Sequence, residues 1–223
     1  MKEEVDPTDY GRLYERRFQS VAAGKKRAAW TVISRWIFDR LGRPACVLDP
    51  AAGALEFIST IPSADRWAID MQPPADPSAL SGITFLAGDT FEVPLPGSKF
   101  DAVFASNFLE HLDSPARVQE FLLKMREALK IGGRIACMGP NFKYCFREYF
   151  DCADHRLALT HVSVEEHLYA AGFELESCTP RFLPYSFRGS LPSNPGLVRW
   201  YLRLPWFWPF FGRQFLVIAR RTT

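Results

Sequence analysis

The chain has 223 residues, of which 48% are hydrophobic, and a formal net charge of +2 at pH 7. This length suits one globular domain with a full core. A charge so close to zero gives no electrostatic case for binding nucleic acid. The start of the chain is charged and polar, which predicts no signal peptide, and no apolar run is long enough to predict a membrane-spanning helix.

The cysteines and histidines form no recognisable ligand motif. The five cysteines are scattered without a C-x-x-C pair, and the four histidines make no H-E-x-x-H pattern. An odd number of isolated cysteines, without a secretion signal, is typical of reduced thiols in the cytoplasm. We therefore expect a cytoplasmic protein without a catalytic metal.

Residues 8–41 have the apolar spacing of two helices, over 8–23 and 25–41, with Gly24 as the break between them and Gly42 as the end of the second. Tyr10 and Tyr14 lie on the apolar side of the first helix. They either pack in the core or form a lid over a substrate pocket.

The segment 45–57 organises the rest of the chain. An apolar run ends in Asp49, and a turn of small residues follows up to Gly53. Leu55 then begins an apolar pattern at helical spacing, shared by Phe57, Ile58 and Ile61. A buried strand, a tight turn and a helix are predicted, which is the opening unit of a nucleotide-binding α/β sheet.

Further strands are predicted at 67–70, 83–87, 100–106 and 134–138, with a loop at 72–80 and a helix at 115–129 that Ser114 caps. Alternation of strands and helices predicts a parallel sheet. Ligands of such sheets bind beyond the carboxyl ends of the strands. Polar residues gather at these ends: Asp49, Asp70, Asp89, Asn107 and Asn141.

The last third of the chain is richer in aromatic residues. Residues 142–162 predict a loop-rich cover, followed by a helix that Ser163 caps and a strand at 173–182. Residues 183–212 form an insertion, with a helix that begins at Asn194-Pro195, and a last strand covers 214–219. The aromatic part of the insertion, 197–211, covers the sheet edge, forms a homodimer contact, shapes an acceptor pocket or lies on a membrane surface.

Taken together, these motifs resemble those of the class I S-adenosylmethionine-dependent methyltransferases. The matching series is Val47-Leu48-Asp49 with Gly53, Ala68-Ile69-Asp70, Gly88-Asp89, Phe100 to Asn107, Leu109-Glu110-His111 and Leu129 to Gly133. The chain is also similar to small-molecule methyltransferases encoded beside sugar and polysaccharide biosynthesis genes, through Pro140 to Cys145 and Arg181 to Tyr185.

The resemblance implies one methyltransferase domain over 1–223, with a cofactor-binding core at 45–139. Its fold is a three-layer, Rossmann-like α/β sheet of seven strands in the order 3-2-1-4-5-7-6, the last strand antiparallel. It also implies that S-adenosylmethionine binds at seven positions and that the methyl acceptor is a small molecule. The implied cofactor-binding residues are Asp49, Ala51, Gly53, Asp70, Met71, Asp89 and Asn107.

The cofactor loop departs from the family pattern. Ala51 and Leu55 stand where the family has glycine, and only Gly53 is retained. Either Leu55 points away from the pocket, or the chain is a non-catalytic relative that uses the fold for binding or assembly.

The candidate catalytic residues are His111 and His155, because methyl transfer to a hydroxyl needs a base. His155 follows Asp154, which could orient its imidazole. The candidate substrate residues are Tyr10, Tyr14, Asn141 and His155.

Overall fold

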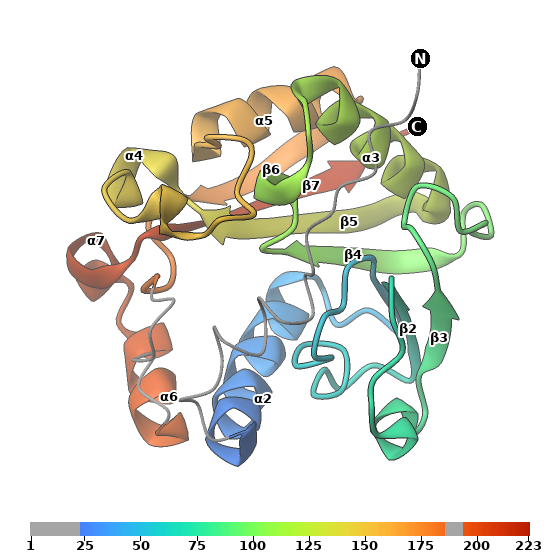
Figure 1. Ribbon diagram of the computed structural model, residues 1–223, viewed down its shortest axis with the longest axis horizontal. Coiled ribbons are helices and arrows are strands. Elements are labelled where there is room, and N and C mark those ends of the chain that lie inside the picture. Colours follow the sequence, from blue (N-terminus) through green and yellow to red (C-terminus); the bar gives the residue numbers. More distant parts are fainter. Residues whose placement is uncertain (1–22, 186–193) are drawn as a thin grey trace.

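The computed structural model describes residues 23–185 and 194–223, and within them seven strands form one sheet in the order β3-β2-β1-β4-β5-β7-β6 (Figure 1). The first five strands run parallel: β1 (Cys46–Asp49), β2 (Asp65–Asp70), β3 (Thr84–Ala87), β4 (Phe100–Ser106) and β5 (Leu129–Pro140). Strand β7 (Gln214–Arg221) runs antiparallel between β5 and β6 (Phe173–Thr179). The predicted strand order and the antiparallel last strand are confirmed.

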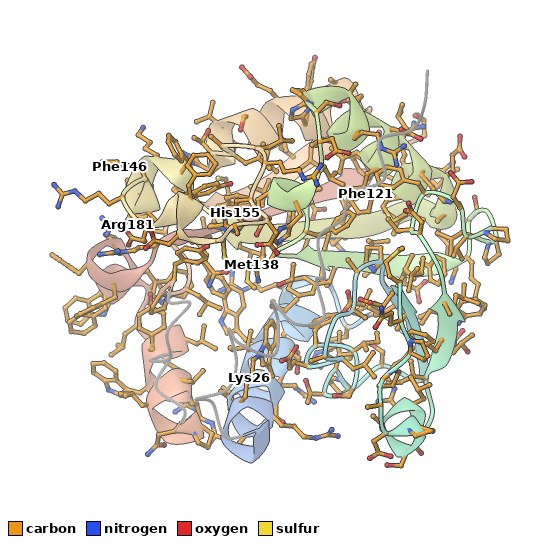
Figure 2. The ribbon with its side chains drawn as sticks, viewed as in Figure 1. Lys26, Phe121, Met138, Phe146, His155 and Arg181 are labelled. Atoms are coloured by element: carbon orange, nitrogen blue, oxygen red, sulfur yellow. The ribbon has the colours of Figure 1, made fainter. Side chains whose placement is uncertain are left out.

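Helices cover both faces of the sheet. Helices α3 (Pro115–Ala128) and α5 (His161–Ala170) lie on one face, and α2 (Ala23–Arg40) and α6 (Pro195–Arg203) lie on the other (Figure 1). Phe121 points from α3 toward the sheet and is fully buried (Figure 2). Because both faces are covered, the parallel strand β1 is buried at every position, which explains its unbroken apolar run.

The remaining elements of the described ranges are short. Two are single turns of α-helix, α4 (Phe142–Cys145) and α7 (Trp208–Phe211). Four are 3-10 helices: η1 (Pro77–Leu80), η2 (Leu109–His111), η3 (Tyr149–Asp151) and η4 (Pro205–Phe207). The predicted loop at 72–80 thus contains η1, and the predicted cover at 142–162 contains α4 and η3. Among the helices of the described ranges, none has the length and apolar character to cross a bilayer.

The predicted helix after β1 is wrong. Residues 51–61 form successive turns, with single α-type hydrogen bonds from the Ser59 N–H to the Leu55 carbonyl and from the Ile61 N–H to the Phe57 carbonyl. Leu55 has a left-handed backbone (φ 61°), which a right-handed helix cannot include. Pro62 follows within a few residues, so too little chain remains to pay the cost of nucleating a helix.

Several predicted boundaries also change. Gly24 does not break a helix, because α2 starts at Ala23 and includes it. Thr160, not Ser163, caps α5, and Ser163 is its partner three residues on in a capping box. Strand β5 starts at Leu129, five residues earlier than predicted, and β6 ends at Thr179 rather than at 182. The predicted cap and proline of α3, Ser114 and Pro115, are confirmed. The predicted helix over 8–23 lies outside the described residues, except for its last residue.

Candidate active site

The turn after β1 lies at the carboxyl end of the central strand. Gly53 has a left-handed backbone (φ 49°), and a Cβ built there would meet no atom within 4 Å. Leu55 is 2% exposed and belongs to the hydrophobic cluster on the α2 face, which also holds Ile33 and Ile37. The Leu55 side chain therefore packs in the core, and the space beside Gly53 is open.

The left-handed backbone of Leu55 predicts that glycine at this position is less destabilising than alanine, the reverse of the usual order. Leu55→Ala and Leu55→Gly both lose buried surface, at a cost of about 2–4 kcal/mol. Only glycine relieves the backbone strain, which amounts to about 1–2 kcal/mol. We expect urea denaturation to find Leu55→Gly more stable than Leu55→Ala by about 1 kcal/mol. An alanine variant as stable as the glycine variant would contradict this backbone conformation.

Asp70, the last residue of β2, connects the neighbouring loops. One carboxylate oxygen accepts a hydrogen bond from the Gly53 N–H at 2.7 Å, and the other accepts one from the Gln72 N–H at 3.4 Å. The Asp70 backbone carbonyl accepts a further bond from the Gly88 N–H at 2.9 Å. Burial raises the pKa of the Asp70 carboxyl, and the backbone N–H donors oppose that rise. The carboxylate is thus fixed beside the turn, with lone pairs that can accept from hydroxyl groups.

Asp49, the last residue of β1, is almost completely buried, with 4% of its surface exposed. This burial raises the pKa of its carboxyl to about 8, against a hydrogen bond from the Ala51 N–H that favours the ionised form. The carboxylates of Asp70 and Glu56 add to the rise. Glu56 is itself paired with Lys26 of α2 (Lys26 is labelled in Figure 2). A cation beside Asp49 would stabilise its ionised form.

Three more predicted cofactor residues lie at the ends of β2, β3 and β4. Met71 follows Asp70 and is 68% exposed. The Asp89 carboxylate accepts a hydrogen bond from the Phe91 N–H at 2.9 Å, which orders the turn after β3. Asn107 has a left-handed backbone (φ 50°), and its N–H donates to the Met138 carbonyl at 2.8 Å. These residues therefore share one edge of the sheet with Asp49, Gly53 and Asp70.

A cluster of titratable side chains follows β4. The Nδ1 atom of His111 lies 2.9 Å from the backbone oxygen of Asp154 and 3.4 Å from its carboxylate. His155, labelled in Figure 2, is 7% exposed. Its ring meets the His111 ring edge to face, with centroids 5.0 Å apart. Asp154, which was predicted to orient His155, thus contacts the ring of His111.

Sequence reasoning missed two members of this cluster. Glu110 is 2% exposed, and burial raises the pKa of its carboxyl to about 7. Tyr149 is fully buried and stacks edge to face with His155 at 4.7 Å between centroids. The motif Leu109-Glu110-His111 was visible in the sequence, but nothing in the residue type indicated that Glu110 is buried.

Asn141 is fully buried, and its side chain makes hydrogen bonds within the protein. Its amide nitrogen donates to the Pro180 carbonyl at 2.8 Å and to Nδ1 of His161 at 2.9 Å. Its side-chain oxygen accepts from the Lys143 N–H at 3.3 Å and so caps α4. These contacts position α4, and the predicted role of Asn141 in substrate binding stays a prediction. Tyr10 and Tyr14, also predicted to bind substrate, lie outside the described residues.

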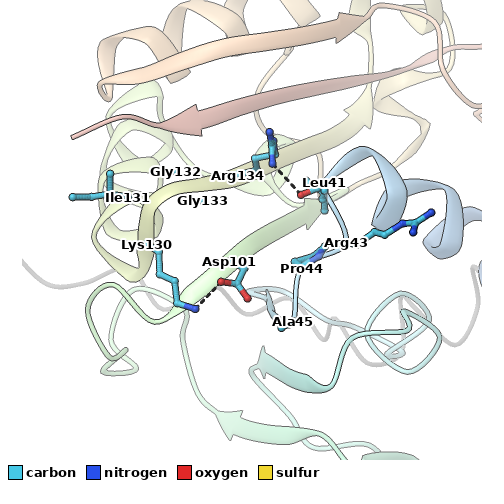
Figure 3. Close-up of a pocket in the computed structure, with 11 residues that line it drawn as sticks. Leu41, Arg43, Pro44, Ala45, Asp101, Lys130, Ile131, Gly132, Gly133 and Arg134 are labelled. Carbon is cyan, nitrogen blue, oxygen red and sulfur yellow. Dashed lines mark hydrogen bonds and ion pairs between the residues drawn. The ribbon is translucent and has the colours of Figure 1, made fainter.

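A separate hollow of about 330 Å³ lies at the opposite, amino ends of the strands (Figure 3). Two contacts join residues that line it: the Lys130–Asp101 ion pair at 2.6 Å and a hydrogen bond from Arg134 to the Leu41 carbonyl at 3.4 Å. Ligands of parallel sheets bind at the carboxyl ends. We therefore assign this hollow no part in the candidate site.

Comparison with known proteins agrees with this geometry. Residues 42–137 match the family model described as a methyltransferase domain. This segment runs from the end of α2 through most of β5 and contains the turn at Gly53, Asp70 and the His111 segment. A comparison with curated protein sequences found no match.

Solved structures of methyltransferases share the fold at low sequence identity. A methyltransferase from Archaeoglobus fulgidus has a TM-score of 0.63 and 20% identity, covering 95% of this chain and 100% of that one. A possible histamine N-methyltransferase from Thermotoga maritima has a TM-score of 0.65 and 14% identity, covering 95% of this chain and 96% of that one. The 1,6-didemethyltoxoflavin-N1-methyltransferase of Burkholderia thailandensis has a TM-score of 0.61 and 20% identity, covering 98% of this chain and 91% of that one. The methyltransferase-domain model thus covers the strands and turns of the candidate site, and the strand order is that of the Rossmann-like methyltransferase fold.

Proposed function

We propose that the chain transfers the methyl group of S-adenosylmethionine to a small-molecule acceptor at the carboxyl ends of β1, β2 and β4. The observation that carries this proposal is the Asp70 carboxylate held 2.7 Å from the Gly53 N–H, beside open space at Gly53. An acid fixed at the end of the second strand, next to a close-approach turn, suits a nucleoside whose ribose hydroxyls need acceptors.

The placement of the other polar residues supports one orientation of the cofactor. Asp70 would accept the ribose hydroxyls, and Asp89 and the exposed Met71 would face the adenine. The methionine part would lie along Asp49, Ala51, Gly53 and Asn107. Its ammonium and sulfonium groups are cations, which suits a turn bordered by a buried carboxylate.

The buried Asp49 predicts a pH-dependent affinity for the cofactor. Asp49 has a pKa of about 8 and so binds a proton at neutral pH, whereas a cation beside it favours the ionised form. Binding should release a proton, and affinity should rise as pH increases from about 6 to 7.5, where the amino group of the ligand is still protonated. Calorimetry in buffers of different ionisation enthalpy measures this release. Asp49→Asn should remove both effects, and a wild-type affinity independent of pH would contradict the assignment.

The acceptor would lie beyond the methyl group, near His111 and His155. Methyl transfer is an in-line displacement on an activated donor, so the protein chiefly aligns the acceptor and removes its proton. His111 is the better base on geometry, because Asp154 orients Nδ1 and leaves Nε2 to accept a proton. His155 and Tyr149 would border the acceptor. The solved 1,6-didemethyltoxoflavin-N1-methyltransferase holds 1,6-didemethyltoxoflavin, a small molecule, which supports this class of acceptor.

A methyl-transfer assay tests the proposed function. Methyl-labelled S-adenosylmethionine is incubated with panels of small hydroxyl and amine compounds, including sugars, and labelled product is separated. We expect S-adenosylhomocysteine to form with at least one panel member. The double variant Asp154→Asn/His111→Gln should no longer form it. The alternative is a non-catalytic relative, which the loss of glycine at Ala51 and Leu55 suggested. Absence of cofactor binding at millimolar concentration would favour that alternative.

The proposed partner surface is the aromatic segment 197–211, which we propose lies on an anionic membrane. Five of its large apolar side chains are about half-exposed or more, namely Leu197, Trp200, Trp206, Phe210 and Phe211. Arg199 and Arg203 are exposed beside them, and residues 177–223 contain no aspartate or glutamate. Aromatic rings next to arginine suit the headgroup region, and the absence of acids removes repulsion from anionic lipids. This placement would suit a lipid-linked acceptor.

A further inference from the structure

The cluster after β4 brings together three side chains of the kinds that bind metal ions. One potential ligand atom from each of Glu110, His111 and His155 lies within 4.8 Å of the other two. Glu110 is 2% exposed and His155 is 7% exposed, while the His111 side chain is 21% exposed. Two imidazoles and a carboxylate in a largely buried position thus form a compact donor set.

The backbone holds this arrangement in place. The carbonyl of Glu110 accepts hydrogen bonds from the N–H groups of Arg156 at 2.8 Å and Leu157 at 3.1 Å. These bonds fix the segment that carries His155 against η2, although the two lie more than forty residues apart. The Glu110 carboxylate lies against Gly139 of β5, where an added Cβ would come within 3.2 Å of it. Backbone contacts near the carboxyl ends of β4 and β5 thus hold the cluster in place.

The second contact of His111 is typical of a metal ligand. Its Nδ1 lies 2.9 Å from the Asp154 carbonyl oxygen, which accepts a hydrogen bond if Nδ1 carries the proton. Metal-binding histidines usually donate their other ring N–H to a carbonyl or a carboxylate, which fixes the tautomer and orientation. Nε2 of His111 is then the atom that coordinates.

We infer that Glu110, His111 and His155 bind one divalent transition-metal cation, such as Zn²⁺ or Mn²⁺. Two imidazole nitrogens favour transition metals over Mg²⁺ and Ca²⁺, which prefer oxygen ligands. At ligand distances of about 2.1 Å, donor atoms of a tetrahedral ion are about 3.4 Å apart, so small side-chain rotations close the site. This inference departs from the sequence prediction of no metal, which considered only closely spaced histidines.

A cation here would lie at the end of β4, on the acceptor side of the proposed methyl position. That role rests on the proposed function: a bound cation lowers the pKa of a hydroxyl that coordinates it. With the cation bound, Nε2 of His111 is a ligand and no longer a base, so the cation takes the place of His111 in activating the acceptor hydroxyl. Binding of the cation itself needs no cofactor and no acceptor. The experiment therefore uses the metal alone, so that failure of metal binding and failure of methyl transfer are separate results.

Co²⁺ is the spectroscopic probe, because its visible absorption reports coordination. The wild-type chain, first treated with chelator, is titrated with Co²⁺ and then with competing Zn²⁺. We expect one equivalent to bind and Zn²⁺ to displace it. Glu110→Gln and His155→Gln should each weaken binding at least ten-fold, whereas His167→Gln, a histidine of α5 outside the cluster, should bind as wild type does.

A measurement on the unmutated protein covers the case in which a buried variant does not fold. Imidazole nitrogen NMR during a Zn²⁺ titration should shift the signals of two histidines, His111 and His155, and leave those of His161 and His167 in place. Equal shifts of all four signals, no saturation at one equivalent, or Mg²⁺ binding as tightly as Zn²⁺ would overturn the inference.

Discussion

Replacing Asp70 by alanine should weaken S-adenosylmethionine binding by about 100-fold or more. Two ribose hydroxyls would lose a charged acceptor, and each such hydrogen bond contributes about 1.5–3 kcal/mol. Since 1.4 kcal/mol is a factor of ten, the two bonds together give at least two orders of magnitude. In the unmutated protein the Asp70 carboxylate also accepts a hydrogen bond from the Gly53 N–H at 2.7 Å. The same substitution removes this bond, which holds the turn after β1. Isothermal titration calorimetry with the cofactor measures the effect.

Asp76 provides the matched control for Asp70. It is an exposed acid six residues further along, and its carboxylate accepts from the Ser78 N–H at 2.9 Å to cap η1. Asp76→Ala should therefore leave cofactor affinity unchanged. Asp70→Asn keeps the shape and one acceptor oxygen, and we expect an intermediate affinity. Circular dichroism checks that the variants are folded. If folded Asp70→Ala bound the cofactor as wild type does, the ribose would have to lie elsewhere.

Combined replacement of Trp206 and Phe210 by serine should abolish pelleting with anionic vesicles. The two side chains are 65% and 73% exposed, so the change removes apolar surface without opening the core. Trp206 stacks on Phe207 at 4.3 Å between centroids, and Phe207 in turn packs against Trp200 at 5.3 Å, so the aromatic surface is continuous. Each buried aromatic ring contributes roughly 1.5–3 kcal/mol of transfer free energy. Loss of two rings should reduce partitioning by a factor of 100 or more.

The control for this surface replaces exposed apolar residues elsewhere. Ile131 and Tyr169 are 69% and 76% exposed and lie outside the aromatic segment, and their double serine variant should pellet as wild type does. Arg199→Gln with Arg203→Gln should weaken binding and reduce its dependence on salt, because each arginine contributes about 1 kcal/mol at an anionic surface. The membrane assignment fails if wild-type protein stays in solution with these vesicles. Loss of a dimer in the Trp206 and Phe210 variant, by sedimentation, would then identify a homodimer contact.

The sheet was predictable because its strands carry their signal locally. The strand at Phe100–Ser106 and the cap and proline at Ser114-Pro115 were predicted to the residue, since an apolar run and a capping pair depend on near neighbours. The turns after β1 were not predictable in this way. Leu55, Phe57, Ile58 and Ile61 have helical spacing, but Leu55 has a left-handed backbone and its side chain packs in the cluster on the α2 face.

The same distinction applies to the candidate site. Residues at strand ends, such as Asp70 and Asn107, could be placed from sequence because every parallel strand directs its carboxyl end to one edge. The contact between His111 and Asp154 could not, since it joins two irregular segments 43 residues apart. Asn141 also lies at a strand end, yet its amide faces Pro180 and His161, segments whose positions depend on the whole fold.

A crystal structure with S-adenosylhomocysteine bound tests the account most directly. We expect both ribose hydroxyls within about 3.2 Å of the Asp70 carboxylate. We also expect the amino-acid end beside Gly53, with Leu55 still packed against the α2 face. A ligand bound away from the Asp70 carboxylate, or a Leu55 side chain that occupies the space beside Gly53, would contradict the proposed cofactor site.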